Sequence, residues 1–415
     1  MTLEEIVVTA QRRAENIQDV PISITSMSGD RLNARFASGD DILALSGAAP
    51  GLYIETSNGR LAPRFYLRGL GNADFTNSAS QPVSLVFDEV PMEKASLKAF
   101  PLFDMASVEI IRGPQGTLFG RNTTAGIVKV NTKRPTAETE GYVNLSAGNL
   151  GTFNGEAALG GTIVEDTLTG RVSVLSQNRS DWVDNGFTGE SDALGGYNVA
   201  AARVQLEWTP NDDLKAWLMH QRQDSDSTTT LFRANVLSQG SNNLNSNFDR
   251  DTVFFDGGEG NKGRLETHGT TLTVDWNVGD YTLTSITSYQ DITHRSARGD
   301  IDGGFGCLFT CGGIPSGPPS TPFNPAASPF VVNVDTGNTI DVEQLTQELR
   351  LASNFDGPMN FQVGTFYFRD DFFGIALNQS AGATEFRPGS TAQIENTAIA
   401  FFGQGSYDVD EKTSR

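Results

Sequence analysis

The chain has 415 residues, a formal net charge of −20 and a hydrophobic content of 38%. An acidic chain without clustered lysines and arginines is unsuited to nucleic acid, because phosphate contacts depend on such clusters. No stretch approaches the roughly 18 uninterrupted apolar residues of a membrane-spanning helix, which excludes a helical membrane protein. Any membrane role must therefore use the weaker signal of alternating strands.

The N-terminal residues 1–13 lack the charged start, apolar core and small-residue cleavage site of a secretory signal. Because the rest of the sequence is unsuited to the cytosol, we expect that a signal was removed or never included. The segment holds three consecutive β-branched residues, Ile6, Val7 and Val8, which favour an extended backbone. Such a terminus can add a strand to a partner's sheet edge, or it can be the first strand of the domain that follows.

Residues 20–136 alternate short strands with short helices and predict a small mixed domain. Ser28 is the predicted N-cap of a helix that ends at Phe36, and Asp40 is that of a helix that ends at Leu45. The strands expected before residue 107 are 20–27, 52–55, 65–68 and 83–87.

Two glycine-punctuated steps follow strands of this domain, one at Arg68-Gly69 and one inside the motif 107–135. In the motif, a strand at 108–111 leads through a turn into a second strand at 127–132. The glycines supply the backbone freedom for a sharp turn and close packing, and two arginines place cations beside it. The turn residues are Arg112, Gly113, Gly116, Gly120 and Arg121.

The motif contains no catalytic nucleophile, general base or metal-binding set. Residues 116–123 superficially resemble a phosphate loop but lack its glycine spacing and its lysine, so we expect no nucleotide hydrolysis. The histidines, His220, His268 and His294, are widely separated and show no metal-ligand spacing. The sequence therefore predicts neither an enzyme nor a bound cofactor.

From residue 137 onward the sequence consists of long runs in which apolar and polar residues alternate, as at 202–209. The connections after the second, fourth, sixth and eighth predicted strands are tight, whereas those after the third, fifth and seventh are longer. This asymmetry is typical of an outer-membrane barrel, and a soluble sandwich has no reason to keep it. The predicted strands are 141–149, 152–164, 168–179, 198–209, 214–224, 264–278, 281–295, 342–353, 359–373 and 392–407.

The motif at 107–135 resembles the plug-domain signature of TonB-dependent outer-membrane receptors, and Arg68-Gly69 is similar to the family's other plug motif. The N-terminal segment resembles the TonB box, with which these receptors engage the TonB protein in the periplasm. The residues that match the box are Glu5, Ile6, Val7, Val8, Thr9 and Ala10.

The resemblance implies a β-rich membrane protein in the outer membrane of a Gram-negative bacterium. Its fold would be a small α+β plug domain followed by an antiparallel transmembrane β-barrel surrounded by lipid. The TonB box and linker would occupy residues 1–19, the plug domain 20–136 and barrel strands 137–415. Because plugged transporters close with about 22 strands and the sequence predicts about ten, we expect an incomplete barrel, the N-terminal part of a longer receptor.

The resemblance also implies import of a scarce ligand, most often an iron-siderophore complex, with energy from the inner-membrane proton gradient through TonB. Receptors of the same family for oligosaccharide, haem or vitamin B12 stay open as alternatives. Outside the family, a passive porin and an adhesin are the competing interpretations. A porin needs neither a plug nor a TonB box, so dependence of uptake on the proton gradient separates the two.

Two further expectations concern charges and cysteines. In the family, plug arginines face acidic residues of the inner barrel wall, and the alternative is that they are solvated at the surface. Cys307 and Cys311 lie in a stretch rich in glycine and proline, where we expect a disulfide that pins a loop; a reduced pair is the alternative. The residues considered for the ionic contacts are Arg68, Arg112 and Arg121 in the plug and Glu207, Asp275 and Glu348 in the barrel.

Overall fold

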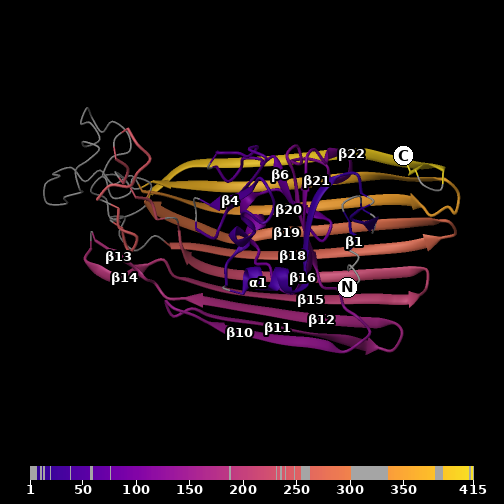
Figure 1. Ribbon diagram of the computed structural model, residues 1–415, viewed down its shortest axis with the longest axis horizontal. Helices are drawn as coiled ribbons and strands as arrows, with labels where there is room; N and C mark the ends of the chain where they lie inside the picture. The colour runs from indigo at the N-terminus through magenta and orange to yellow at the C-terminus, as the bar shows by residue number, and fades with distance from the viewer. Residues whose placement is uncertain are drawn as a thin grey trace.

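The computed structural model describes residues 7–9, 12, 15–18, 20–37, 39–56, 59–74, 76–186, 188–229, 231–233, 236–238, 240–246, 248–253, 262–300, 335–378, 387–410 and 413–414. These residues form a large sheet and a small domain that lies against one of its faces (Figure 1). None of the helices in this part of the chain is long and apolar enough to cross a membrane. Cys307 and Cys311 lie outside the described residues.

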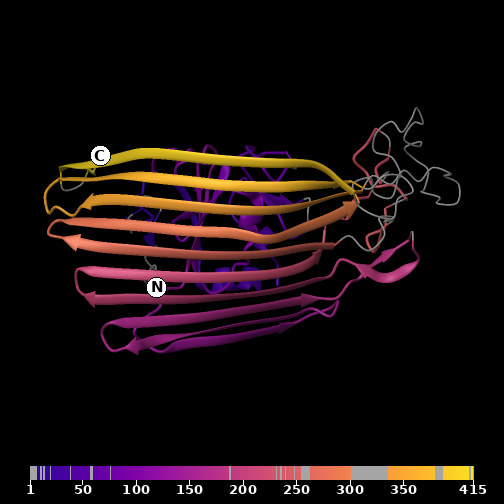
Figure 2. The same cartoon turned by 180° about the vertical axis from the view of Figure 1, so that it is seen from behind.

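The large sheet is an antiparallel meander in which each long strand pairs with the next long strand along the chain (Figure 2). Ten long strands form it within the described residues, which confirms the prediction of about ten, and the short β23, Thr413–Ser414, pairs with the last of them. The long strands are β10 Glu140–Ala147, β11 Phe153–Val164, β12 Leu168–Arg179, β15 Tyr197–Asn211, β16 Leu214–Thr228, β18 Lys262–Val278, β19 Tyr281–Asp300, β20 Asp335–Ser353, β21 Met359–Asn378 and β22 Arg387–Asp410.

Side chains alternate between the two faces of this sheet as the sequence predicts. On β15, Arg203 and Gln205 are 0% exposed and point toward the small domain, whereas Val204 and Trp208 are 45% and 46% exposed on the opposite face. The outer face is therefore apolar, and the inner face carries buried polar side chains together with apolar ones, such as Trp217 and Met219, that join the core of the small domain. This is the arrangement of a barrel wall between lipid and an enclosed domain.

The connections at the two ends of the sheet differ in length (Figure 1). Tight turns join β11 to β12, β15 to β16, β18 to β19 and β20 to β21 at one end. At the other end, short strands that the sequence did not predict form a separate three-stranded sheet. These strands are β13 Val183–Asn185, β14 Glu190–Leu194 and β17 Thr252–Val253.

The small domain is built on a mixed five-stranded sheet in the order β3-β8-β9-β6-β7, with β6 and β9 parallel. β8 and β9 are the two strands of the motif, and their apolar side chains are buried in the core. The elements are β3 Ser23–Ser28, α1 Gly29–Phe36, η1 Ile42–Leu45, β4 Leu52–Thr56, β5 Pro63–Leu67, β6 Val83–Phe87, β7 Val90–Met92, η2 Ala95–Ala99, β8 Met105–Arg112, α2 Gly116–Phe119 and β9 Gly126–Thr132.

One of the two predicted helix caps needs correction. Asp41, not Asp40, caps the second helix, and its side chain accepts a hydrogen bond from Leu43 N at 2.9 Å. This helix is a single 3₁₀ turn, so the capping residue directly precedes Ile42. Ser28 is the N-cap of α1 as predicted, but its side chain makes no capping hydrogen bond, and it is also the last residue of β3.

Gly126 shows how closely the motif strands pack. Its φ of 145° lies in a region that side chains other than glycine rarely adopt, and a Cβ there would lie 2.3 Å from the carbonyl oxygen of Ile111. Gly116, in the same motif, has open space, because the nearest atom to an added methyl group would be Thr123 Oγ1 at 3.8 Å.

We therefore expect Gly126→Ala to destabilise the small domain by about 3 kcal/mol or more, because a backbone clash and a strained dihedral act together. Limited proteolysis of the detergent-solubilised protein measures this as faster cleavage within residues 20–136. The matched variant Gly116→Ala keeps wild-type resistance. Equal resistance of the two variants would contradict this close packing of the motif strands.

Candidate functional site

The N-terminal segment lies against the small domain but does not join its five-stranded sheet. β1 (Val7–Val8) pairs only with β2 (Glu15–Asn16) in a two-stranded ribbon, and Val8 is fully buried. Of the residues that match the TonB box, the structure describes Val7, Val8 and Thr9, while Glu5, Ile6 and Ala10 lie outside the described residues. The segment is thus held by contacts other than strand addition to the five-stranded sheet.

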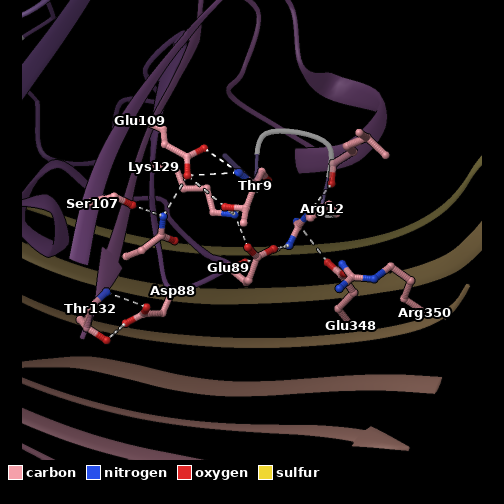
Figure 3. Close-up of polar contacts among 12 residues, drawn as sticks. Thr9, Arg12, Asp88, Glu89, Ser107, Glu109, Lys129, Thr132, Glu348 and Arg350 are labelled. Atoms are coloured by element: carbon pink, nitrogen blue, oxygen red, sulfur yellow. Dashed lines mark hydrogen bonds and ion pairs between the residues drawn. The ribbon is translucent and has the colours of Figure 1, made fainter. Parts of the chain in front are cut away.

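Thr9 is held by two charged side chains of the motif strands (Figure 3). Its backbone N–H donates to the Glu109 carboxylate at 3.2 Å, and its hydroxyl donates to the same group at 3.1 Å. Lys129 Nζ donates to the carbonyl oxygen of Thr9 at 3.1 Å and to its hydroxyl oxygen at 2.6 Å. Glu109 and Lys129 are cross-strand partners in β8 and β9, so the register of the motif hairpin creates this clamp.

Lys129 also pairs with Glu89, which lies in the two-residue turn between β6 and β7. Both turn residues have positive φ, 44° at Asp88 and 75° at Glu89, as tight hairpin turns require. Asp88 fixes the turn, because its carboxylate accepts hydrogen bonds from Thr132 N at 3.0 Å and Thr132 Oγ1 at 2.8 Å. The turn thereby holds Glu89 between two cations.

The second cation is Arg12, whose side chain is 3% exposed and joins three parts of the molecule. It pairs with Glu89 of the small domain and, through Nη2 at 3.3 Å, with Glu348 on β20 of the large sheet. Its Nε donates to Leu118 O at 3.2 Å, and its guanidinium lies 4.4 Å from the centre of the Phe119 ring. Arg12 is therefore the residue that ties the N-terminal segment to the large sheet.

The charges in this cluster alternate in sign from the small domain to the large sheet (Figure 3). Glu348 continues the series by accepting from Arg350 Nη1 at 2.8 Å. We call this set the N-terminal latch; its charged members are Glu109, Lys129, Glu89, Arg12, Glu348 and Arg350. With three carboxylates and three cations, the latch buries charge without a net excess, which lowers the cost of removing these groups from water.

Two carboxyl groups of the latch have shifted pKa values in opposite directions. Burial by itself would raise the pKa of Glu89, but the charges of Lys129 and Arg12 lower it well below its usual value. At Glu109, burial raises the pKa, although Lys129 and the hydrogen bonds from Thr9 act in the other direction. Glu89 is thus the firmly ionised centre of the latch.

The motif glycines and arginines were visible in the sequence, but most of the latch was not. Gly120, with φ of 72°, ends α2, so that Leu118 O and the Phe119 ring face Arg12. Nothing in the sequence singled out Arg12 or Glu89. Arg12 follows the segment that resembles the TonB box, and Glu89 lies between two short apolar runs. At the other glycine step, Arg68 and Gly69 both have a positive φ, 53° and 79°, whereas Gly71 does not.

The expected ionic contacts of the motif arginines are wrong. Arg121 pairs with Glu93 of the small domain at 3.3 Å and lies 4.8 Å from the Phe368 ring of β21, while Arg68 and Arg112 make no ion pair within the described residues. Glu207 pairs with Lys215 on the neighbouring strand. The candidate that does contact the N-terminal part is Glu348, and its partner is Arg12.

Other buried ion pairs join the small domain to the large sheet. Asp104 accepts two hydrogen bonds from Arg171 of β12, at 2.6 and 2.7 Å, and Lys94 pairs with Asp370 of β21 at 2.9 Å. All four side chains are at most 2% exposed. The latch is therefore one of several polar attachments, and the one that includes the N-terminal segment.

Comparison with known proteins supports the fold and the domain. Residues 16–127 match the family model of the TonB-dependent Receptor Plug Domain. The chain is 33% identical over 210 residues to the pesticin receptor of Yersinia pestis, a match that covers 50% of this chain and 30% of that protein. It is 28% identical over 151 residues to an iron-regulated outer membrane virulence protein of Vibrio cholerae, covering 35% of this chain and 22% of that protein.

Solved structures with the same fold include two siderophore receptors. The ferric yersiniabactin uptake receptor FyuA from Yersinia pestis is matched with a TM-score of 0.62 and 20% identity, over 94% of this chain and 62% of that one. FpvA of P. aeruginosa, in a complex with a heterologous ferric pyoverdine, is matched with a TM-score of 0.75 and 15% identity, over 98% and 52%. The chain thus spans roughly half to two thirds of these structures.

A polar-lined antiparallel sheet that faces a small domain built on the β8–β9 motif defines a plug-and-barrel protein of the outer-membrane type. Residues 16–127 are similar to the TonB-dependent receptor plug domain, and the fold is that of solved receptors in which a plug lies inside a barrel.

Removal of the Arg12 charge should release the N-terminal segment. We expect Arg12→Gln to lower the hydrogen-exchange protection of the β1 and Thr9 amides by tenfold or more, because breaking a buried pair costs about 3–5 kcal/mol. Exchange measured by mass spectrometry on the solubilised protein gives this value. The control Arg31→Gln, an exposed arginine of α1, should leave it unchanged; unchanged protection in Arg12→Gln would show that Arg12 does not hold the segment.

The lowered pKa of Glu89 predicts a pH dependence for the docked segment. A carboxyl whose pKa is lowered on folding contributes stability above its ordinary pKa of 4.5, and this contribution is lost as the pH falls below that value. We expect β1 protection, corrected for intrinsic exchange, to fall with decreasing pH below 4.5 in the wild type. Glu89→Gln should show weaker protection at neutral pH and a smaller dependence of protection on pH than the wild type. An equally steep dependence in this variant would show that a group other than Glu89 titrates.

Proposed function

We propose that this protein is a receptor of the outer membrane that imports a scarce ligand with energy supplied through TonB. The observation that carries the proposal is the N-terminal latch, in which the TonB-box match is docked against the plug and tied to the barrel wall through Arg12 and Glu348. A segment held by reversible polar contacts at the tight-turn end of the barrel is placed for withdrawal toward that side.

In this proposal, residues 1–19 are the TonB box and linker, 20–136 the plug and 137–415 barrel strands. TonB would pair with the box as an added strand, through main-chain hydrogen bonds of residues 7–9. Because Glu109 and Lys129 already engage Thr9, and β2 already pairs with residues 7–8, pairing with TonB requires the latch to open. A pull on the opened segment then acts on β3, the edge strand of the plug sheet and the first plug element along the chain.

An iron-siderophore complex is the ligand that the related proteins favour. The names of FyuA and FpvA refer to ferric yersiniabactin uptake and to ferric pyoverdine, and the V. cholerae relative is named as iron-regulated. The chain is also 28% identical over 153 residues to a vitamin B12 transporter of Vibrio vulnificus, so vitamin B12 is the second candidate ligand. Induction of the gene by iron limitation supports the first candidate, and induction by another nutrient overturns it.

A proline in the box tests the coupling to TonB. We expect Val8→Pro to abolish uptake of the iron complex by energised cells while surface binding remains, because proline removes a main-chain donor that strand pairing needs. Uptake and binding of radioactive ferric siderophore by whole cells, with and without a proton uncoupler, provide the measurement.

Val8→Thr is the matched control, since it keeps the β-branched shape and the backbone N–H. It should take up ligand at close to the wild-type rate. Undiminished uptake in Val8→Pro, or uptake that ignores the uncoupler in the wild type, contradicts TonB-dependent import and favours a passive pore.

A further inference from the structure

The plug is attached to the large sheet at two places, and the two attachments differ in how well their buried charges are hydrogen-bonded. One is centred on Asp104 and reaches β11, β12 and β15, and the other is centred on Lys94 and reaches β20 and β21. Three strands, β16, β18 and β19, separate β15 from β20 in the sheet, so the two places lie well apart (Figure 1). We call them the Asp104 attachment and the Lys94 attachment.

Both oxygens of the Asp104 carboxylate accept hydrogen bonds. Arg171 donates to them through Nη2 at 2.6 Å and Nε at 2.7 Å, and the Ser173 hydroxyl donates to one of them. The Asp104 N–H donates to Glu156 Oε1 at 2.9 Å. A bidentate arginine–carboxylate pair with further hydrogen bonds offsets much of the cost of removing both charges from water, so this attachment is firm.

The chain itself also ties the plug to this side of the wall. Residues 133–139 connect β9, the last strand of the plug, directly to β10. Gln205 Nε2 donates to the carbonyl oxygen of Lys133 at 2.9 Å, at the start of that connection. Arg203 Nη1 donates to the carbonyl oxygen of Phe103 at 3.1 Å. A displacement of the plug therefore leaves this side in place, because a covalent connection and a paired charge both hold it.

The Lys94 attachment buries an ion pair with few hydrogen bonds. Lys94 Nζ lies 2.9 Å from Asp370 Oδ2 on β21, and both side chains are at most 2% exposed. Within the described residues, neither carboxylate oxygen of Asp370 accepts a hydrogen bond. A buried carboxylate without hydrogen bonds has not recovered what it loses on leaving water. Separation of the two surfaces would let water reach Asp370, which lowers the free energy needed to open this side.

The plug segment of the Lys94 attachment belongs to the edge of the plug sheet. Gln344 of β20 accepts from Glu93 N at 3.0 Å and donates through Nε2 to Pro91 O at 2.8 Å. Pro91 lies in β7, the edge strand, whose neighbour in that sheet is β6. The turn before β7 contains Glu89, the partner of Arg12 in the latch. One short segment therefore carries the contacts to β20 and β21 and is connected to the N-terminal latch.

A cavity of about 680 Å³ lies along the same strands, between α2 of the plug and the wall. β20, β21 and β22 contribute Glu348, Phe366 and Phe402 to its lining, and the plug contributes Phe119. Arg12 of the latch also lines it, so withdrawal of the N-terminal segment removes part of its wall. Open space is thus already present on the side of the Lys94 attachment.

We propose that the plug is hinged at the Asp104 attachment and separates from the wall at the Lys94 attachment, so that the imported ligand passes between residues 89–94 and strands β20 and β21. The inference rests on the proposed import function and adds the position at which the path opens. The residues of the Asp104 attachment are positioning residues, since they hold the plug while the other side moves. Lys94, Gln344 and Asp370 line the opened path, which therefore admits water and a polar ligand.

The test compares how often the two sides open. Two single-cysteine variants are made in a chain that carries Cys307→Ser and Cys311→Ser: Thr346→Cys on the inner face of β20, 2% exposed, and Ala201→Cys on the inner face of β15, 7% exposed. We expect a small hydrophilic maleimide to label Thr346→Cys at least tenfold faster than Ala201→Cys in the full solubilised chain, because the weaker attachment opens more often. Equal rates, or faster labelling of Ala201→Cys, overturn the proposal.

A charge variant tests the role of the Lys94 attachment itself. Asp370→Asn leaves the buried Lys94 without its counter-charge and should speed the labelling of Thr346→Cys by a further tenfold or more. Asp371→Asn is the matched control, since it removes the same charge from the next residue of β21, where the side chain is 39% exposed and pairs with Arg369. If the two variants label equally, the Lys94–Asp370 pair does not hold this side and the proposal falls.

Whole cells connect the opening to import and separate its failure from failure of the receptor function. During uptake of a radioactive ferric siderophore, labelling of Thr346→Cys should rise in energised cells relative to cells treated with an uncoupler, while labelling of Ala201→Cys stays constant. If labelling of Thr346→Cys stays constant while uptake depends on the proton gradient, the receptor function stands and the assignment of the path falls. If uptake ignores the uncoupler, TonB coupling falls, and the comparison in the solubilised chain still decides which side opens.

Discussion

Many side chains that the large sheet turns toward the plug are polar or charged, alongside apolar ones such as Trp217 and Met219 that join the plug core. Buried polar groups must be paired, so this wall is stable only against a domain that supplies partners. The plug supplies them as ion pairs, such as Asp104 with Arg171 and Lys94 with Asp370, and as backbone carbonyls. Gln205 Nε2, for example, donates to Lys133 O at 2.9 Å.

This constraint also explains how one domain can be held firmly and still contain a releasable part. The Asp104–Arg171 pair joins two rigid strands or strand ends, whereas the Arg12–Glu348 pair joins the wall to a short two-stranded ribbon at the N-terminus. Breaking the second pair does not expose the apolar plug core. A force on the N-terminal segment therefore acts on the contacts of the latch before it acts on the plug core. In the latch, each cation has a carboxylate partner, so the cluster holds protein to protein.

The sequence by itself determined the strands and their alternation, because side chains in a strand repeat every two residues and the repeat is visible locally. The motif hairpin was also predictable, since Gly126 and its neighbours satisfy a backbone requirement that few other residues meet. Only the tertiary structure decided which charges meet. Arg12 and Glu89 are 77 residues apart, and Glu348 lies far beyond both, so their contact depends on how the plug docks in the wall. The same reason hid the Asp104–Arg171 pair, because no local periodicity in a sequence records a contact that exists only once two separately built parts are packed together.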